Sequence, residues 1–369
     1  MNKHVAAWVK GSIKYAIGFG VLALVIYQYW DDKVLKDDQG KEFVVAGLKT
    51  LLQGPIEFGW LAATGVLVAF ALSCQIIRWY ILVRALDLPF TLRNAFRLGM
   101  VGIFANTFLP GAVGGDFVKA VFIARDNRDR MTAAVATVIM DRAMGLFGLI
   151  LFVAVSGSVA WSLDDPRIVD NANLQKIVTT MAIIAAASVA VFLLLGLLPQ
   201  RRVDRFAGRL AGIPKVGKSL SELWNVVWMY RQRLRTVALG VVLSALSHFG
   251  LVFAFHSASH VFQPENPATD QPTLSEHMVI APIGFIVQAL PVSPGGVGVG
   301  EAAFAGLYKL SKRPESRGVI ARLSLRVTEW IIGLIGYVVY LRMKAKHELP
   351  TDAEEMPPVP AGHPPAGAG

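Results

Sequence analysis

The residues best suited to chemistry in this sequence are charged side chains that fall within or beside long apolar stretches. Carboxylates and cations placed in this way can form structural ion pairs, or they can contact a charged ligand, since a guanidinium fork matches the geometry of a phosphate. The set consists of Asp116, Lys119, Asp141, Arg142, Glu301, Arg326 and Glu329.

Composition indicates where these charges lie. Hydrophobic residues make up 54% of the 369 residues and charged residues only 17%, and the mean hydropathy is +0.50. A chain of this kind is a polytopic membrane protein rather than a soluble domain. An Asp, Lys or Arg at the centre of a membrane helix costs roughly 2.5–3.5 kcal/mol, so the set must face itself or a hydrated cavity.

Two interpretations follow, and they are compatible. In the first, the charges are purely structural pairs that hold elements together. In the second, they line a polar path for a charged headgroup, with Arg142 and Arg326 as phosphate contacts. Spacing places Arg326 and Glu329 on one helix face. Asp141 and Arg142 point about 100° apart, and we expect their partners to be Lys119 and Asp116.

Two Pro-Gly stretches share a pattern of glycine spacing followed by a carboxylate. An offset of 184 residues places Pro110 on Pro294 and, without a gap, Arg142 on Arg326. The chain is therefore predicted to contain a duplicated unit. The predicted turn residues are Pro110, Gly111, Gly114 and Gly115 in the first copy, and Pro294, Gly295, Gly296 and Gly298 in the second.

Apolar segments predict an all-α membrane protein with six full spans. These cover residues 13–30, 58–82, 132–155, 174–198, 236–262 and 318–341. Segments 98–110 and 111–124 are each about 20 Å long as helices, too short to cross a core of about 30 Å. They form a predicted re-entrant hairpin, and residues 278–294 and 295–310 form a second one. Each repeat has three full crossings, so the second is inverted and the two hairpins are opposed.

Loop charges predict the orientation. Residues 199–235 contain nine Arg or Lys and two carboxylates, a net charge of +7. This basic loop is expected to lie on anionic headgroups at the cytoplasmic face of a bacterial inner membrane. Both termini are expected to be cytoplasmic. Repeat one covers about 10–160 and repeat two about 174–345 of a membrane domain at 1–348, and 349–369 is a predicted disordered Pro-rich tail. Nucleic acid is not an expected partner.

One feature opposes this topology. Lys309, Lys312, Arg313 and Arg317 follow the second hairpin and would lie outside, against the positive-inside trend. If that hairpin crosses the membrane instead, the C-terminus lies outside.

Three further motifs are expected to have no catalytic or ligand-binding role. Residues 212–219 match the P-loop pattern, but no strand-loop-helix context is predicted around them, so nucleotide binding is not expected. His256 and His260 are four residues apart and favour interface packing over a metal site. Cys74 is a lone cysteine that excludes an intrachain disulfide. We expect no metal and no cofactor.

The charged residues and Pro-Gly stretches described above also resemble those of a known family. The matching features are Arg78-Trp79, Asn106 with Leu-Pro-Gly-Ala-Val-Gly-Gly-Asp116, Asp141-Arg142 before Gly145-Leu146, and Ser-Pro-Gly-Gly-Val-Gly298 with Glu301. Together they resemble the transmembrane domain of lysylphosphatidylglycerol synthases and its stand-alone flippase-like relatives, the UPF0104 proteins, over about residues 10–345. The resemblance implies a lipid-flipping membrane domain and places Asn106 on the substrate path.

The chain departs from that family in two ways. Lys119 stands where the family often has Arg, which keeps the charge but loses the bidentate fork. A short Pro-rich tail stands where the synthases carry a soluble aminoacyl-transferase domain, so lipid aminoacylation is expected to be absent.

The sequence therefore favours a flippase or facilitator for an anionic phospholipid or lipid-linked substrate, with membrane lipids as its partners. The alternatives are a non-catalytic membrane partner of a lipid-modifying or glycosyl-transferring enzyme, and an anion channel. This reading predicts that Pro110 approaches Pro294 near the midplane, with Asp116 and Arg142 on one cavity wall.

Overall fold

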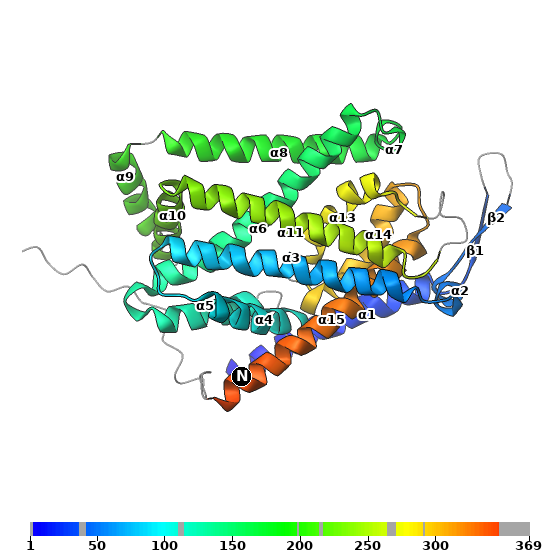
Figure 1. The fold of residues 1–369 in the computed structure, drawn as a ribbon, viewed down its shortest axis with the longest axis horizontal. Coiled ribbons are helices and arrows are strands. Elements are labelled where there is room, and N and C mark those ends of the chain that lie inside the picture. The colour runs from blue at the N-terminus through cyan, green and yellow to red at the C-terminus, as the bar shows by residue number, and fades with distance from the viewer. Residues whose placement is uncertain are drawn as a thin grey trace, which may run out of the picture.

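Long helices dominate the computed structural model, which describes residues 3–36, 42–109, 114–197, 199–213, 217–263, 271–290 and 292–346. The predicted spans correspond to helices that run lengthwise through the molecule (Figure 1). They are α1 (Lys3–Gln28), α3 (Phe58–Ala85), α6 (Met131–Ser162), α8 (Ala172–Gly196), α11 (Leu234–Ser259) and α15 (Glu315–Ala345). The tail predicted from residue 349 lies outside the described residues.

By length and apolar composition, four of these helices can cross a membrane: α3, α6, α8 and α11. The apolar part of α1 is shorter, covering Ser12–Gln28. Only 11% of the apolar stretch of α8 is buried within the protein. Exposed apolar surface of that extent requires a hydrocarbon environment, because water would make it an aggregation site.

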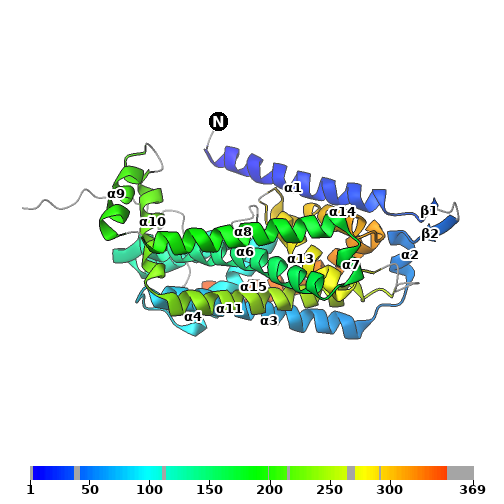
Figure 2. The same ribbon diagram turned by 90° about the horizontal axis from the view of Figure 1, so that it is seen from above.

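The two ends of the molecule differ. At one end, here the basic end, α9 (Gln200–Ala211) and α10 (Gly217–Arg231) form a helical pair, with Trp224 donating to the Val203 carbonyl at 3.2 Å. Opposite lies the loop end, with strands β1 (Lys33–Lys36) and β2 (Glu42–Val45), α2 (Leu48–Gln53) and α7 (Pro166–Val169) (Figures 1 and 2). The antiparallel β1–β2 pair was not anticipated from the sequence.

Each segment that was predicted to form a re-entrant hairpin contains two helices, its two arms. The first is α4 (Leu92–Phe108) and α5 (Gly114–Asp126), followed by η1 (Arg128–Arg130), and it lies in the half nearer the basic end (Figure 2). The second is α13 (Leu274–Gln288), η2 (Pro294–Gly296) and α14 (Val299–Leu310), in the half nearer the loop end. The pair α4–α5 and the pair α13–α14 therefore occupy opposite halves of the molecule.

The second turn is longer than predicted. Helix α13 ends at Gln288, well before Pro294, and the backbone then turns through Gly295, Gly296 and Gly298, all at positive φ. Gly298 has φ 77°, and a Cβ there would lie 2.4 Å from the Gly18 carbonyl oxygen of α1. Only glycine combines that backbone conformation with so close a contact.

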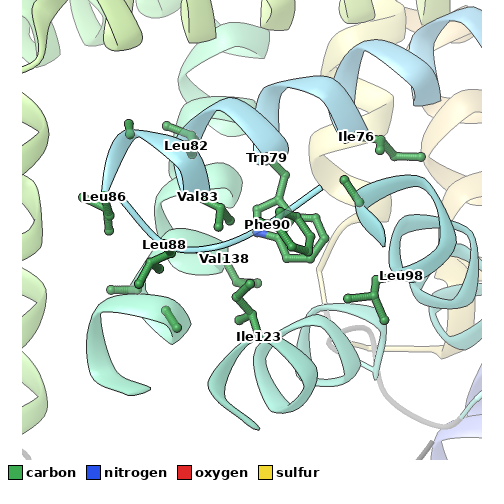
Figure 3. Packing of buried hydrophobic residues seen from close by; sticks show 14 of the residues in the cluster. Ile76, Trp79, Leu82, Val83, Leu86, Leu88, Phe90, Leu98, Ile123 and Val138 are labelled. Carbon is green, nitrogen blue, oxygen red and sulfur yellow. The ribbon is translucent and has the colours of Figure 1, made fainter. Parts of the chain in front are cut away.

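A core at the basic end fixes the first hairpin against its neighbours (Figure 3). Trp79 of α3 is fully buried and meets Phe90 edge-on, with ring centroids 5.0 Å apart. Leu98 of α4, Ile123 of α5 and Val138 of α6 belong to the same cluster. Large aromatic side chains dominate such cores, so this cluster sets the position of α5 relative to α6.

Candidate functional site

Each repeat places an arginine of the helix after its hairpin against a carboxylate in the first turn of the second hairpin arm. In the first repeat, Arg142 of α6 contacts Asp116 of α5. In the second, Arg326 of α15 contacts Glu301 of α14. The 184-residue offset that aligns the two arginines thus corresponds to a repeated ion pair.

The Arg142–Asp116 pair is the accessible one. The Arg142 side chain is 45% exposed and the Asp116 side chain 19%. Beside it, the Asn106 amide oxygen accepts from the Gly115 backbone N–H at 2.8 Å, which ties the end of α4 to the start of α5. Gly115 permits this approach, since a Cβ there would lie 2.1 Å from the Gly102 carbonyl oxygen. The predicted Asp116–Arg142 pairing is confirmed.

Asp141 has a different partner from the one expected. It accepts from Arg78 Nε of α3 at 2.7 Å, and Arg78 Nη1 also donates to Ser244 Oγ of α11 at 2.8 Å. The Arg78 side chain is 4% exposed. The predicted Asp141–Lys119 pair is wrong, because α6 turns Asp141 toward α3 and α11 rather than toward α5. This buried pair joins three helices.

Lys119 lies elsewhere on the first hairpin. Its ammonium sits 5.2 Å from the centroid of the Trp79 ring, a cation–π arrangement. Its stem runs along α4, because a Cβ at Gly102 would lie 3.2 Å from Lys119 Cε. The stem therefore packs on α4, while the ammonium lies on the Trp79 ring of α3.

The second-repeat pair is closed. Arg326 is bidentate on Glu301, with Nε–Oε1 at 2.5 Å and Nη2–Oε2 at 3.1 Å, and it also donates to the Gly295 and Gly296 carbonyls at 3.1 Å each. The side chains of Arg326 and Glu301 are 2% and 0% exposed. With four of its five N–H donors engaged, Arg326 holds the second turn and is a poor phosphate contact.

Glu329 also departs from expectation. Its partner is Arg322, one turn before Arg326, at 2.7 Å, and the Arg322 side chain is fully buried. The expected Arg326–Glu329 pair is therefore replaced by two parallel pairs. Sequence reasoning missed Arg322, and it named Arg78 only as part of the family resemblance, although both lie within apolar segments, the same signal that identified the others.

The second turn reaches the end of the first hairpin's leading arm. A Cβ on Gly295 would lie 3.2 Å from the Thr107 carbonyl oxygen. Tyr15 of α1 donates to the Phe108 carbonyl at 2.6 Å, and a Cβ on Gly18 of the same helix would lie 2.8 Å from Ser293 Cβ. Pro110 and Gly111 lie outside the described residues, so the Pro110–Pro294 approach stays a prediction.

The basic residues that opposed the predicted topology differ in their surroundings. Arg313 pairs with Glu276 of α13 at 3.0 Å, and the two side chains are 12% and 3% exposed. Arg317 donates to the carbonyls of Phe262 and Gln263 at 3.4 Å, and Lys309, which is 76% exposed, lies 3.6 Å from Glu315. Of these three charges, the one on Arg313 is therefore balanced by a well-enclosed carboxylate.

The two histidines that are four residues apart pack among other side chains of the helical bundle. His256 Nδ1 lies 2.8 Å from His277 Nδ1, and His277 Nε2 lies 2.9 Å from the Tyr308 hydroxyl. His260 bonds to the His256 carbonyl. The P-loop match follows the helix α9, not a strand, and its residues 214–216 lie outside the described part of the chain.

Similarity to known membrane proteins covers most of the chain. The sequence profile described as "Lysylphosphatidylglycerol synthase TM region" matches residues 42–336. Two relatives from Methanothermobacter thermautotrophicus, each called "UPF0104 membrane protein", are 25% identical over 289 residues and 22% identical over 305. The first match covers 73% of this chain and 81% of the relative, and the second covers 76% and 83%.

A helical bundle whose long apolar helices are largely exposed at their surface defines an all-α integral membrane protein. Within that class, the chain belongs to the family of the lysylphosphatidylglycerol synthase transmembrane region.

Proposed function

We propose that this protein moves an anionic phospholipid or lipid-linked headgroup across the membrane, with its acyl chains remaining in the bilayer. The observation that carries the proposal is the accessible Arg142–Asp116 pair beside a broken helix, which contrasts with the enclosed guanidiniums of Arg326 and Arg78. A guanidinium that is partly open to its surroundings can exchange a carboxylate for a phosphate.

The proposal includes a topology. Six helices, α1, α3, α6, α8, α11 and α15, are full spans, and the two hairpins are re-entrant from opposite faces. Non-helical backbone at that depth requires enclosure by protein, and the burial of Pro294 and Gly296 supports it. The basic end is assigned to the cytoplasm, because α9 carries Arg201, Arg202, Arg205 and Arg209.

Arg142 is assigned the phosphate contact, and Asp116 is assigned the role of its resting counter-ion. Asn106 fixes the backbone around Asp116 through Gly115. A structural role is assigned to Arg326, Glu301, Arg322 and Glu329. Both interpretations of the charged set therefore hold, each for a different group of residues.

Reconstitution into liposomes with headgroup-labelled phosphatidylglycerol tests the proposal. Wild-type protein should expose inner-leaflet label to an external quencher faster than protein-free vesicles, and Arg142→Gln and Asp116→Asn should slow that movement about tenfold or more. The matched control is Arg167→Gln, which removes an exposed Arg–Asp pair with Asp165 near the loop end. Absence of movement for every anionic lipid contradicts a flippase. A chloride current in the same vesicles would instead favour the channel alternative.

A further inference from the structure

A second polar feature lies away from the Arg142–Asp116 pair. A cavity of about 440 Å³ opens between α4, α5 and the C-terminal part of α15. That volume falls in the range of about 300–1,000 Å³ that is typical of small-ligand sites. It lies among the ends of the first hairpin's arms, where α4 begins and α5 finishes.

The polar side of the cavity is built for an anion. Arg97 of α4 and Arg125 of α5 line it from the two arms of the hairpin, and both are partly buried. The Asn94 amide lies one turn before Arg97. Two guanidiniums on separate helices can clamp a phosphate from two sides, with bidentate geometry at each.

The remaining lining suits a lipid more than a free anion. Leu98, Phe122 and Met343 form an apolar wall, which would cover the glycerol and the first carbons of the acyl chains. Asp126 adds one carboxylate, so the four charged and amide groups carry a net charge of +1. That charge matches a singly charged phosphodiester, and the carboxylate can accept from a hydroxyl or ammonium of the headgroup.

The cavity also connects with the residues described above. Lys119 and Asp126 are seven residues apart on α5, so they share a helix face and lie about 10 Å apart along the axis. Asp116 lies a further turn along the same helix. Charged groups therefore recur from the cavity at the basic end to the Arg142–Asp116 pair.

We infer that this cavity is the docking site for the phosphodiester headgroup of a lipid, from which the headgroup passes along α5 to Arg142. The inference rests on the proposed function and adds to it a defined place of entry. Phosphate contacts by Arg97 and Arg125 supply the affinity, and the apolar wall distinguishes a lipid from inorganic phosphate.

Binding to the full-length protein in phosphatidylcholine nanodiscs tests this site directly. Calorimetric titration with dihexanoyl-phosphatidylglycerol should give saturable binding, and Arg97→Gln and Arg125→Gln should each weaken it about tenfold, which corresponds to about 1.4 kcal/mol. Arg125→Lys should weaken it less, because the charge remains. Arg128→Gln, an exposed neighbour outside the cavity lining, should change it less than about twofold. An unchanged thermal unfolding midpoint shows that each variant is folded.

Three outcomes decide the matter. Binding by the Arg97→Gln/Arg125→Gln double variant within about twofold of wild type overturns the docking site, whatever the transport assay gives. Inorganic phosphate that binds as tightly as the lipid analogue overturns the assignment to a lipid. Arginine-dependent lipid binding in a protein that moves no lipid supports the docking site while the proposed function fails.

Discussion

At the scale of single residues, the charged groups divide by accessibility rather than by position in the sequence. Arg142 and Arg326 occupy matching places in the repeat, yet the first is 45% exposed and the second 2%. Removing one partner of an enclosed pair leaves a buried charge without compensation, which is far more costly than breaking an exposed pair. The two arginines should therefore respond differently to mutation.

Glu301→Gln should destabilise the protein by about 3–5 kcal/mol, because Arg326 would keep a buried charge without its bidentate partner. Thermal unfolding in detergent measures the change. The matched control is Glu315→Gln, whose partner Lys309 is 76% exposed, and it should cost less than about 1 kcal/mol. Equal midpoints for the two variants would contradict the structural role of Glu301.

The charged residues also show how far the sequence could predict the site. Apolar context was enough to select Asp116, Asp141, Arg142 and Glu301, since such charges need partners. Partner choice was predicted correctly only for Asp116 and Arg142, because the choice depends on how each helix is rotated in the bundle. Asp141 thus met Arg78, distant in sequence, instead of Lys119.

At the scale of elements, the second hairpin depends on glycine where its turn meets α1. Gly298 has a positive φ and a neighbouring carbonyl at 2.4 Å from its Cβ position. Gly306, in the middle of α14, has nothing within 4 Å of its Cβ position. The two glycines provide a matched pair on one helical arm.

Backbone strain alone costs about 1–3 kcal/mol. Gly298→Ala should destabilise the protein by more than that, because a steric clash with the Gly18 carbonyl is added to the strain. Gly306→Ala should be neutral or stabilising by up to about 1 kcal/mol, because alanine favours helix. Thermal unfolding of both variants checks the contrast. A tolerated Gly298→Ala would mean that the turn does not contact α1 in this way.

A second element-scale link joins two loops at the basic end. Asp87, after α3, accepts from Arg233, before α11, at 2.6 Å. The Arg233 guanidinium holds the pKa of the Asp87 carboxyl below its ordinary value. A lowered folded-state pKa contributes stability above the unfolded pKa of about 3.9, and that contribution disappears as the pH falls through the folded-state value.

Asp87→Asn should accordingly lower the unfolding midpoint at pH 7 by a small amount, because the pair is exposed. The difference from wild type should shrink as the pH falls below about 4. Unfolding curves for both proteins between neutral and acidic pH measure it. A difference that stays constant over that range would contradict a contribution from the ionised pair.

At the scale of the whole molecule, the two pairs of short helices α4–α5 and α13–α14 were predictable, because Pro-Gly spacing and short apolar arms are local signals. The β1–β2 pair was not, since its strands lie in a short segment between two apolar helices where periodicity says little. The helical pair α9–α10 was predicted only as a basic loop. Its positive charge indicated a place on anionic headgroups, but not the hydrogen bond from Trp224 of α10 to the Val203 carbonyl of α9.

Cysteine labelling can test the proposed orientation of the molecule. In a Cys74→Ala background, Gln232→Cys at the basic end and Ser162→Cys at the loop end should react with a membrane-impermeant maleimide from opposite sides of sealed vesicles. The basic-end position should react only in inverted vesicles, because basic segments remain cytoplasmic. Labelling of both positions from one side would contradict the six-span topology.

The contacts of helix α1 determine how far the chain can be truncated at its N-terminus. The family match starts at residue 42, after α1 has ended, yet Tyr15 holds the end of the first hairpin's leading arm and Gly18 receives the second turn. A fragment trimmed to the matched region would lose both contacts and leave the Gly298 turn uncovered. The smallest unit that can be expected to fold therefore starts well before the boundary that sequence comparison draws, and fusion partners or crystallisation truncations belong upstream of Tyr15.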